Sequence, residues 1–565
     1  MRKNLFLLLF TFCFLSAWSQ SYYNEWIDYS KTYYKFKVAA NGLYRIPQST
    51  LQAAGLGATP AQNFQLFRNG QQVPVYTSVA SGPLSGSDYI EFWGQMNDGK
   101  PDKDLYDVPA YQMSDKWSLE TDTAVYFLTV NTNVAANLRY VNANNNVAGN
   151  VLPAEPWFMH TQGVHFRDQI NPGFAAVVGE NLHASTYDKG EGWSSGDIYA
   201  TQNVTTTMTN LFPATTAPVN ATYTIGAAGN ALFDRTMNIQ INGNLVANQV
   251  MSYFDYFKGS FNVPLANIST GSANMVVTNQ SSNGNDRMVV MMHELTYPRL
   301  FNFGGAANFE FTLPASSGNY LEIDNFNFGA ATPVLYDITN GQRYAAVING
   351  SQLRFALPAS ATARNLVLVS EVAANITNIT SLVPRTMTNL MQAANQGDYL
   401  IITTKKLHNP ADPNNGVVRY KNYRGSLNGG SFNTKVIDVE DLYDFYGYGI
   451  KQHPLAIKNY LRHARAAFTA IPKYVLLIGR GTAYNEARIN ENQPFQETLN
   501  MVPTFGYPAS DNMLSADPGL HIQTIPIGRI GAINLTELNN YLDKVIAYEA
   551  QMANNVFTVA NKAWM

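Results

Sequence analysis

The segment KYVLLIG, residues 473–479, is an apolar run of strand length, and VPTFGYPASDNML, residues 502–514, follows it. Strands that are apolar on both faces are typical of parallel sheets covered by helices. The two prolines, the glycine and the Asp-Asn pair predict an ordered loop in the second segment. Since ligands bind beyond the carboxyl ends of parallel strands, we expect this loop to lie on the rim of a site.

The surrounding sequence alternates between strand and helix patterns. Further strands are expected in DYLIITT (398–404), TKVIDVE (434–440) and HIQTIPIG (521–528). Helices are expected at 383–397, 416–426, 452–468 and 534–550. This alternation predicts right-handed crossovers and a parallel sheet.

Two of these helices show clear amphipathic patterns. In the helix at 452–468, the spacing predicts a buried face of Ile457, Tyr460, Leu461, Ala464 and Phe468. In the last helix, Asn534 and Glu537 have the spacing of a capping box. Its predicted buried stripe comprises Leu538, Tyr541, Leu542, Val545 and Tyr548.

Upstream of residue 383 the chain shows short apolar or alternating runs, separated by turn residues about every ten positions, which is typical of β-sandwiches. Thr32 to Ile46 alternates around an Asn-Gly pair and predicts a hairpin. We expect a β-rich region at 21–155, a β-sandwich at 156–310, a small β-module at 311–382 and an α/β domain at 383–565.

Composition narrows the class of protein. The 565 residues are 46% hydrophobic and 14% charged, which predicts several folded domains. The net charge of −3 and the lack of a basic cluster argue against nucleic acid as a partner.

The first twenty residues predict export. Arg2 and Lys3 precede an apolar run and small or polar residues, the pattern of a secretory signal peptide, and no later run is long enough to span a membrane. Cys13 is the only cysteine and lies in this segment, so the mature chain is expected to lack a thiol.

Several segments occur together in an order that resembles a known family. They are DYLIITT, KVIDVEDLYDFYGYG (435–449), HPLAIKNYL (453–461), YVLLIG, VPTFGYPASDNML and IPIGRIGAINLTELNNYLDKVIAYE (525–549). This set is similar to the gingipain-type cysteine peptidases, and most similar to the PorU-like sortases of the type IX secretion system in Bacteroidetes. EWIDYSKTYYKFKVAANGLYRIP (25–47) and EFWGQMNDGKPDKDLYD (91–107) resemble the β-rich leader of these proteins.

The resemblance implies a multidomain protein in which β-rich N-terminal modules, including a β-sandwich, precede an incomplete caspase-like α/β domain with a parallel sheet. It places the catalytic His and Cys beyond Met565, so the chain is expected to be inactive alone. None of its eight histidines is assigned as catalytic, and His453 and His463 are expected to be surface or packing residues. It also implies a protein or peptide substrate, type IX secretion system components as partners, and a secreted or cell-surface location.

The resemblance carries over to individual residues only at the rim. Ser510-Asp511 matches the Ser-Asp motif that lines the pocket for a basic P1 side chain in arginine-specific gingipains. The alternative is that Asp511 caps a turn through its own backbone. Glu497 is a weaker candidate for a carboxylate near the catalytic His. Gly479-Arg480 departs from the Gly-Asp of relatives, which puts the role of that Asp in doubt.

The sequence leaves two other interpretations open, a structural calcium site and a non-catalytic function. NDGKPDKD (97–104) clusters acidic oxygens that suit structural calcium, although a solvated loop is the commoner use of such a turn and no cofactor is otherwise expected. The alternative function is a non-catalytic surface protein whose β-sandwich binds glycan or protein, with Trp157 and Trp193 as an aromatic platform.

Overall fold

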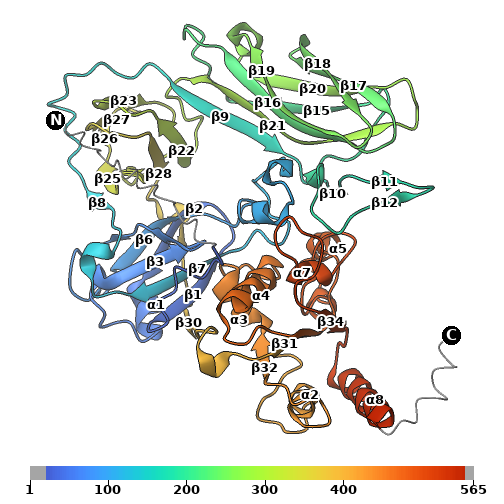
Figure 1. The fold of residues 1–565 in the computed structure, drawn as a ribbon. Coiled ribbons are helices and arrows are strands. Elements are labelled where there is room, and N and C mark those ends of the chain that lie inside the picture. Colours follow the sequence, from blue (N-terminus) through green and yellow to red (C-terminus); the bar gives the residue numbers. More distant parts are fainter. Residues whose placement is uncertain (1–20, 554–565) are drawn as a thin grey trace, which may run out of the picture.

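The computed structural model describes residues 21–553, so the predicted signal peptide and Cys13 lie outside the described residues. Three β-rich units precede an α/β unit at the C-terminal end (Figure 1). The predicted fold class, β-rich modules followed by an α/β region with a parallel sheet, is confirmed.

The first unit consists of two sheets that share one core. Phe36 of one sheet lies against Phe92 of the other, with ring centroids 5.9 Å apart. The first sheet runs β30 (Val383–Thr386), β1 (Thr32–Val38), β7 (Ala124–Val130), β3 (Phe64–Arg68), β4 (Gln71–Val73). The second runs β29 (Ile376–Asn378), β2 (Gly42–Pro47), β6 (Tyr89–Gly94), β5 (Tyr76–Thr77), and α1 (Gln48–Ala53) follows β2.

The hairpin predicted between Thr32 and Ile46 is wrong. β1 and β2 are the expected strands, but they belong to different sheets and do not pair. Both strands carry apolar side chains into the same core, and packing face to face buries those side chains on both strands. The Asn-Gly connection therefore crosses between two layers.

The second unit is a β-sandwich, drawn in green at the top of Figure 1. One sheet runs β14 (Ile198–Tyr199), β21 (Arg287–Arg299), β16 (Ala221–Gly229), β19 (Tyr256–Val263), with β9 (Phe158–His165) also paired to β21. The other runs β15 (Asn203–Met208), β20 (Ala273–Gln280), β17 (Asp234–Ile241), β18 (Asn244–Ser252). Methionine and aliphatic side chains of both sheets form its core.

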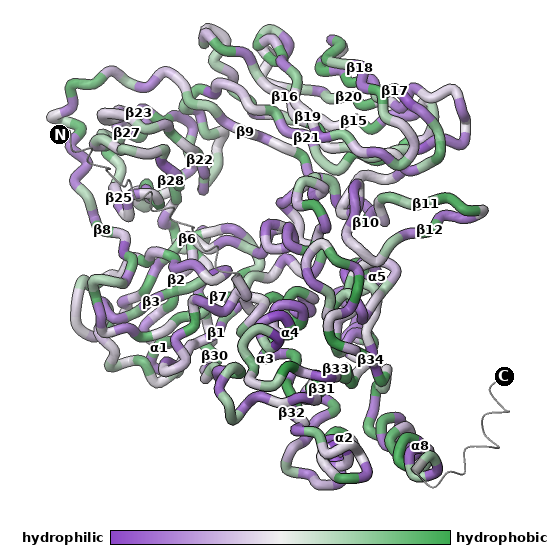
Figure 2. The backbone as a smooth tube through the Cα atoms, viewed as in Figure 1, coloured by the Kyte–Doolittle hydropathy of each residue, from purple (hydrophilic) through white to green (hydrophobic). Residues whose placement is uncertain are grey.

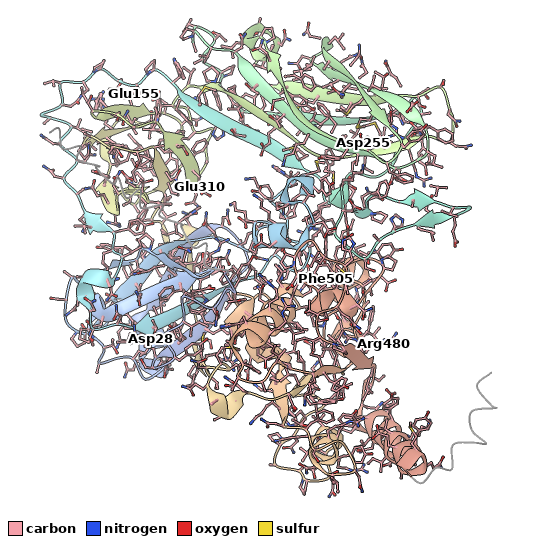
Figure 3. All side chains as sticks on the ribbon, viewed as in Figure 1. Asp28, Glu155, Asp255, Glu310, Arg480 and Phe505 are labelled. Carbon is pink, nitrogen blue, oxygen red and sulfur yellow. The ribbon has the colours of Figure 1, made fainter. Side chains whose placement is uncertain are left out.

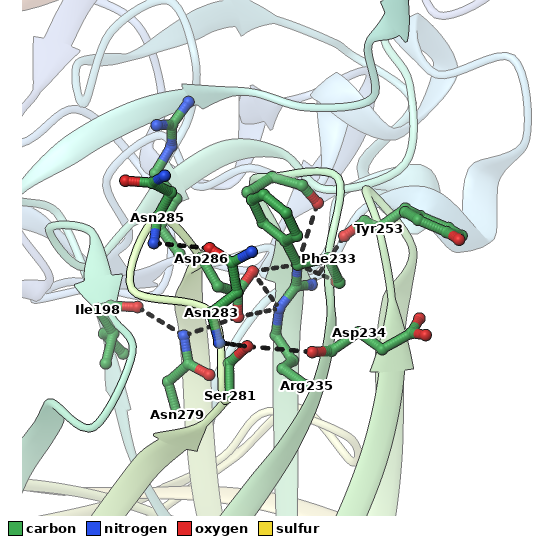
Figure 4. A network of polar contacts seen from close by, with 12 residues as sticks. Ile198, Phe233, Asp234, Arg235, Tyr253, Asn279, Ser281, Asn283, Asn285 and Asp286 are labelled. Atoms are coloured by element: carbon green, nitrogen blue, oxygen red, sulfur yellow. Dashed lines mark hydrogen bonds and ion pairs between the residues drawn. The ribbon is translucent and has the colours of Figure 1, made fainter.

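One end of this sandwich is held by a buried ion pair. The guanidinium of Arg235 lies 2.7 Å from the carboxylate of Asp286, and both side chains are fully buried (Figure 4). Arg235 also donates to the backbone carbonyls of Ala231, Phe233 and Tyr253. These bonds satisfy the buried charge and join three connecting loops.

Two short pairs of strands connect this sandwich to the rest. They are β10 (Gln169–Pro172) with β13 (Glu191–Ser194), and β11 (Ala176–Val177) with β12 (Asn181–Leu182). The β11–β12 hairpin projects outward, and β11 is coloured hydrophobic in Figure 2. Val178 at its tip is 73% exposed.

The third unit is a small two-sheet module with a phenylalanine-rich core. Its sheets run β22 (Asn308–Leu313), β28 (Arg364–Val369), β24 (Val334–Asp337), β25 (Gln342–Ala345), β8 (Val141–Asn142), and β23 (Asn319–Ile323), β27 (Gln352–Leu357), β26 (Val347–Asn349). β8 joins it from before the sandwich, and the chain then returns through β29 and β30 to the first unit. The domain boundaries expected from the sequence stay a prediction.

The α/β unit contains a sheet of four parallel strands. Its order is β32 (Thr434–Asp438), β31 (Tyr399–Thr403), β33 (Tyr474–Ile478), β34 (Ile527–Ile530). Its helices are α2 (Gly416–Gly425), α3 (Val439–Tyr446), α4 (Leu455–Ala467), α5 (Tyr484–Ile489), α6 (Gln496–Leu499), α7 (Asn512–Ser515) and α8 (Leu535–Ala553). α3 and α4 cover one face, and α2 and α8 cover the other.

Short 3-10 helices punctuate the loops of all units. They are η1 (Ala61–Asn63), η2 (Pro101–Leu105), η3 (Pro109–Tyr111), η4 (Val134–Ala136), η5 (Leu265–Ile268), η6 (Ala373–Asn375) and η7 (Ala393–Asn395).

The helix predicted at 383–397 is wrong. Val383–Thr386 forms β30, which pairs antiparallel with β1, and only η7 follows before β31. β30 is an edge strand, where Pro384 can be accommodated although it has no N–H. Pairing with a distant strand therefore overrides the local helical spacing.

The other helix predictions are largely confirmed. The predicted face of α4 is buried throughout, and Glu537 donates its backbone N–H to Asn534 Oδ1 over 2.9 Å at the start of α8. The α8 stripe is only partly right, because Tyr541 and Tyr548 are about half exposed while Leu538 and Leu542 are buried. The sequence missed α3, which begins directly after β32.

Candidate functional site

The topology marks one edge of the parallel sheet as a place for a ligand. The chain runs from the central strand β31 first to β32 on one side and later to β33 on the other. Such a switch point opens a crevice beyond the carboxyl ends of the strands. Thr403 Oγ1 donates to the carbonyl of Ile478 over 2.9 Å at this point and joins the two strand ends.

A small cavity of about 70 Å³ lies at this edge. Glu497 contributes a carboxylate, and its side chain is 62% exposed. Lys406 Nζ lies 2.9 Å and Lys451 Nζ 3.7 Å from that carboxylate. The hydrogen bond from Lys406 lowers the pKa of Glu497, so this carboxylate is ionised at neutral pH. The structure thus places Glu497 at the predicted edge with both lysines as partners.

The loop at 502–514 is ordered, as the sequence predicts. Phe505 and Ser510 exchange backbone hydrogen bonds of 3.2 and 2.9 Å, which closes the loop. Val502, Phe505, Met513 and Leu514 are buried. The loop is therefore packed beside the cavity: Asn500 and Met501, directly before it, line the cavity, whereas residues 502–514 do not.

Asp511 is joined to the sheet by Arg529 of β34. Arg529 Nε lies 3.1 and 2.9 Å from the two carboxylate oxygens of Asp511, and Nη2 lies 2.7 Å from one of them. The remaining donors of Arg529 bond the carbonyls of Gly479, Val502 and Pro503. This bidentate geometry is the strong form of an arginine–carboxylate pair.

The pair decides between the two sequence interpretations only in part. Asp511 precedes α7, but its side chain makes no capping hydrogen bond, so the alternative of a self-capped turn is wrong. The guanidinium that its carboxylate contacts belongs to the chain itself. The assignment of Ser510 and Asp511 to a pocket for a basic P1 side chain stays a prediction. The sequence gives no sign that Arg529 is the partner of Asp511.

A segment of the β-rich part covers this loop. The rings of Tyr187 and Phe505 are 5.2 Å apart, and those of His183 and Tyr507 are 5.7 Å apart. Phe505 lies on the side of the α/β unit that faces the β-rich units (Figure 3). A Cβ at Gly506 would lie 1.8 Å from the carbonyl oxygen of Ser185. The contact is therefore close enough to require glycine.

Buried polar contacts join the same two parts. His453 Nε2 lies 3.2 Å from Asp102 Oδ1, and both side chains are buried. Tyr484 donates its hydroxyl to Glu191 Oε1 over 2.5 Å. Burial raises the pKa of Glu191 to about 8, so this carboxyl is largely protonated at neutral pH. The β-rich part and the α/β unit thus share an interface that contains buried polar contacts.

The other histidines near this region also have structural contacts. His463 stacks on Tyr22 at 4.4 Å, and His521 pairs with Asp107 at 2.9 Å. The packing role expected for His453 and His463 agrees with these contacts.

The acidic turn at 97–104 does not direct its carboxylates to one point. Asp98 pairs with Lys100, Asp102 with His453, and Asp104 accepts from the hydroxyl of Tyr23. Within residues 21–553, no His, Cys, Asp and Glu side chains form a group of three that could hold a metal ion.

Trp193, proposed for an aromatic platform, is only 8% exposed and donates to the carbonyl of Ser118. It is therefore a packing residue in this structure, whereas Trp157 is half-buried. Among the described helices, none is both long and apolar enough to cross a membrane.

The fold and the site define a class: a multidomain protein in which β-sandwich units precede and cover a parallel α/β unit, with a cavity and a packed loop at the carboxyl edge of its sheet. Residues 392–564 match the model of peptidase family C25. The resemblance of this region to the gingipain-type peptidases is thereby confirmed. None of the curated proteins compared with the chain matches it.

Solved structures show where the whole architecture recurs. The crystal structure of dimeric latent PorU from Porphyromonas gingivalis matches with a TM-score of 0.59 and 15% identity, over 94% of this chain and 50% of that one. The chain thus spans half the length of PorU, and the likeness shows the fold. The CBM36-1 domain of a multidomain xylanase from the hindgut metagenome of Trinervitermes trinervoides also matches, at 11% identity, over 24% of this chain and 96% of that domain. Its TM-score of 0.16 is too low to support an argument.

Proposed function

We propose that the chain is the N-terminal portion of an exported, gingipain-like cysteine endopeptidase or type IX secretion sortase. Its reaction would be peptide-bond hydrolysis or transpeptidation by a Cys-His dyad that lies beyond residue 565. The substrate would be a protein or peptide, and components of the type IX secretion system are proposed partners. The location would be the cell surface or the medium.

The observation that carries this proposal is the carboxyl edge of the parallel sheet, with its cavity and the packed loop beside it, which falls within the segment that matches peptidase family C25. The fold of PorU over 94% of the chain supports the extension to the β-rich units. Within the proposal, the β-rich units position the peptidase unit and cover its loop through the contacts of Tyr187 and Gly506.

Ser510, Asp511 and Glu497 are the proposed substrate-binding residues at the rim. For Asp511 to hold a basic P1 side chain, its carboxylate must be shared with Arg529 or released by it, because the bidentate pair occupies both oxygens. We therefore expect basic-residue selectivity only in a state in which the loop at 502–514 has moved relative to β34.

A thiol-dependence experiment tests the function. The protein encoded by the complete gene and the chain of 565 residues are each incubated with a panel of peptides under reducing conditions, with and without iodoacetamide. We expect cleavage or transpeptidation that iodoacetamide abolishes in the complete protein, and none in this chain, because its only cysteine lies in the predicted signal peptide. Activity of the complete protein that resists iodoacetamide, or thiol-sensitive activity of this chain alone, would contradict the proposal.

A further inference from the structure

A second cavity lies where the β-rich part meets α4 and the loop that follows Phe505. Its volume is about 480 Å³, within the range of small-molecule sites. Much of its wall is apolar, from Leu105, Leu455, Phe505, Met513 and Leu520. Two cationic side chains of α4, Lys458 and Arg462, and two carboxylates, Asp104 and Asp107, also line it.

Lys458 is a buried cation in this wall. Lys458 is only 4% exposed, and its ammonium group donates to the carbonyl of Met513 over 2.9 Å. The ammonium also lies 4.8 Å from the ring centroid of Phe505. An ammonium has three donors, and one carbonyl satisfies only one of them.

Arg462 lies one turn further along α4. Its Nη1 donates to Asn459 Oδ1 over 3.0 Å, whereas its Nε is buried without a hydrogen-bond partner. Within residues 21–553, no carboxylate comes within 4.0 Å of either Lys458 or Arg462. Like charges spaced by four residues on a helix repel each other, so this pair costs stability while the cavity is empty.

The acidic side chains nearby are engaged elsewhere. Asp107 pairs with His521, Asp517 pairs with Arg465, and Asp104 accepts from the hydroxyl of Tyr23. The two cations therefore retain unmet hydrogen-bonding capacity beside a cavity whose two lining carboxylates, Asp104 and Asp107, have other partners. A buried cation without a paired anion is costly, and an anionic ligand would offset that cost.

We propose that this cavity binds a small ligand with an anionic head, a carboxylate or a phosphate, on an apolar body. Lys458 and Arg462 hold the head: Lys458 contributes a point charge, and Arg462 contributes a guanidinium of the shape that carboxylate and phosphate match. The apolar body lies against Phe505 and Met513. Because both residues belong to the segment that contains the rim loop, occupancy of the cavity also steadies that loop. The site stands independently of the proposed peptidase function.

Titration of Lys458 gives the site a pH dependence. Burial, and then the charge of Arg462, lower the pKa of Lys458 to about 8, while Asp107 and Asp517 act in the opposite direction. Asp104 of η2, Tyr23 and Tyr106 also line the cavity, and His521 pairs with Asp107. Below about pH 8 the ammonium is charged and holds an anion. Above that pH it loses the proton, so affinity for an anion falls.

Calorimetric titration of the full chain with three matched probes tests the site. Hexanoate carries a carboxylate, hexyl phosphate carries a phosphate, and hexanamide has the same apolar body without charge. We expect hexanoate or hexyl phosphate to bind at least about tenfold more tightly than hexanamide at pH 7. Binding by only one of the two anions identifies the head group and supports the site. Equal binding of hexanamide, or no binding of any probe at millimolar concentration, overturns it.

Variants then locate the site. Lys458→Met and Arg462→Gln should each weaken anion binding by about tenfold, whereas Lys473→Met, on an exposed lysine that pairs with Asp398, should leave it unchanged. Unchanged binding in both cavity variants overturns the assignment. A pH profile of the wild-type protein tests the site even if the variants do not fold. The affinity of the wild-type protein for hexanoate should fall by about tenfold or more between pH 7 and pH 9.5. A flat profile would exclude Lys458 as the ligand-holding cation.

Discussion

The ion pair between Asp511 and Arg529 predicts that Asp511 stabilises the rim loop. Asp511→Asn keeps the shape of the side chain and one acceptor oxygen but removes the charge. The guanidinium of Arg529 would then keep only its three backbone carbonyl partners and the neutral amide.

The structure sets the size of the effect between two limits. Breaking a fully buried ion pair costs about 3–5 kcal/mol, and an exposed pair is worth about 0–1 kcal/mol. The side chains of Arg529 and Asp511 are 12% and 23% exposed, and asparagine retains part of the hydrogen bonding. We therefore expect a loss of about 2 kcal/mol in the local stability of the loop, after allowance for solvent screening.

Native-state hydrogen exchange measures this loss where it occurs. A change of about 2 kcal/mol corresponds to exchange about 30-fold faster in peptides that cover residues 502–514. Asp517→Asn is the matched control: its carboxylate pairs with Arg465 on the same side of the α/β unit, but both side chains are 29% exposed and the pair has no carbonyl network. We expect little change in that variant.

Equal exchange of the loop in Asp511→Asn and Asp517→Asn would refute this reasoning. Arg529 would then be held by the carbonyls alone, and the carboxylate of Asp511 would be available to a basic substrate residue. A double-mutant cycle with Arg529→Gln separates the pair from other effects, and a coupling near zero would lead to the same conclusion.

Three further predictions follow from the covered loop, the interface and the N-terminus. Gly506→Ala should lower the free energy of unfolding by about 1–3 kcal/mol more than the control Gly519→Ala does. Both glycines have a positive φ, but only a Cβ at Gly506 would meet a neighbour, the carbonyl oxygen of Ser185. Equal losses of the two variants in urea denaturation would contradict this contact. Burial raises the pKa of Glu191 to about 8 from an ordinary 4.5, so its contribution to stability is full below about pH 4.5 and is lost as pH rises towards 8. Glu191→Gln should flatten that decline in stability measured from pH 5 to 9, whereas the exposed Glu486→Gln should not. N-terminal sequencing of secreted material should begin near Gln20 or Ser21, and retention of Cys13 would disprove the signal peptide.

The sequence by itself determined part of the α/β unit, although β34 (Ile527–Ile530) overlaps only the last two residues of the strand expected at 521–528. β31 and β33 are short and apolar on both faces, and α4 and α8 have a 3.6-residue pattern, so the signals lie within one segment. The buried face of α4 and the cap at Asn534 were predictable because each depends on residues at most eleven positions apart. The rim loop was predictable for the same reason, since turn residues act locally.

Tertiary structure decided what depends on distant partners. The segment at 383–386 has a helical neighbourhood in sequence but becomes β30 because β1 offers backbone hydrogen bonds. The strands around Asn41 separate into two sheets because one shared core buries both. Asp102 and His453 are 351 positions apart, yet they form one buried contact at the interface of the two parts.

The role of Asp511 shows the same limit at the site. The sequence placed this carboxylate on the rim, but only the packing of β34 beneath the loop supplies its guanidinium partner. The burial of Lys458 without a paired carboxylate was equally hidden, because the helical pattern of a sequence does not show how deeply a lysine is buried. Local propensity acts between neighbours in the chain, whereas burial and charge pairing are set by which surfaces meet when the chain folds.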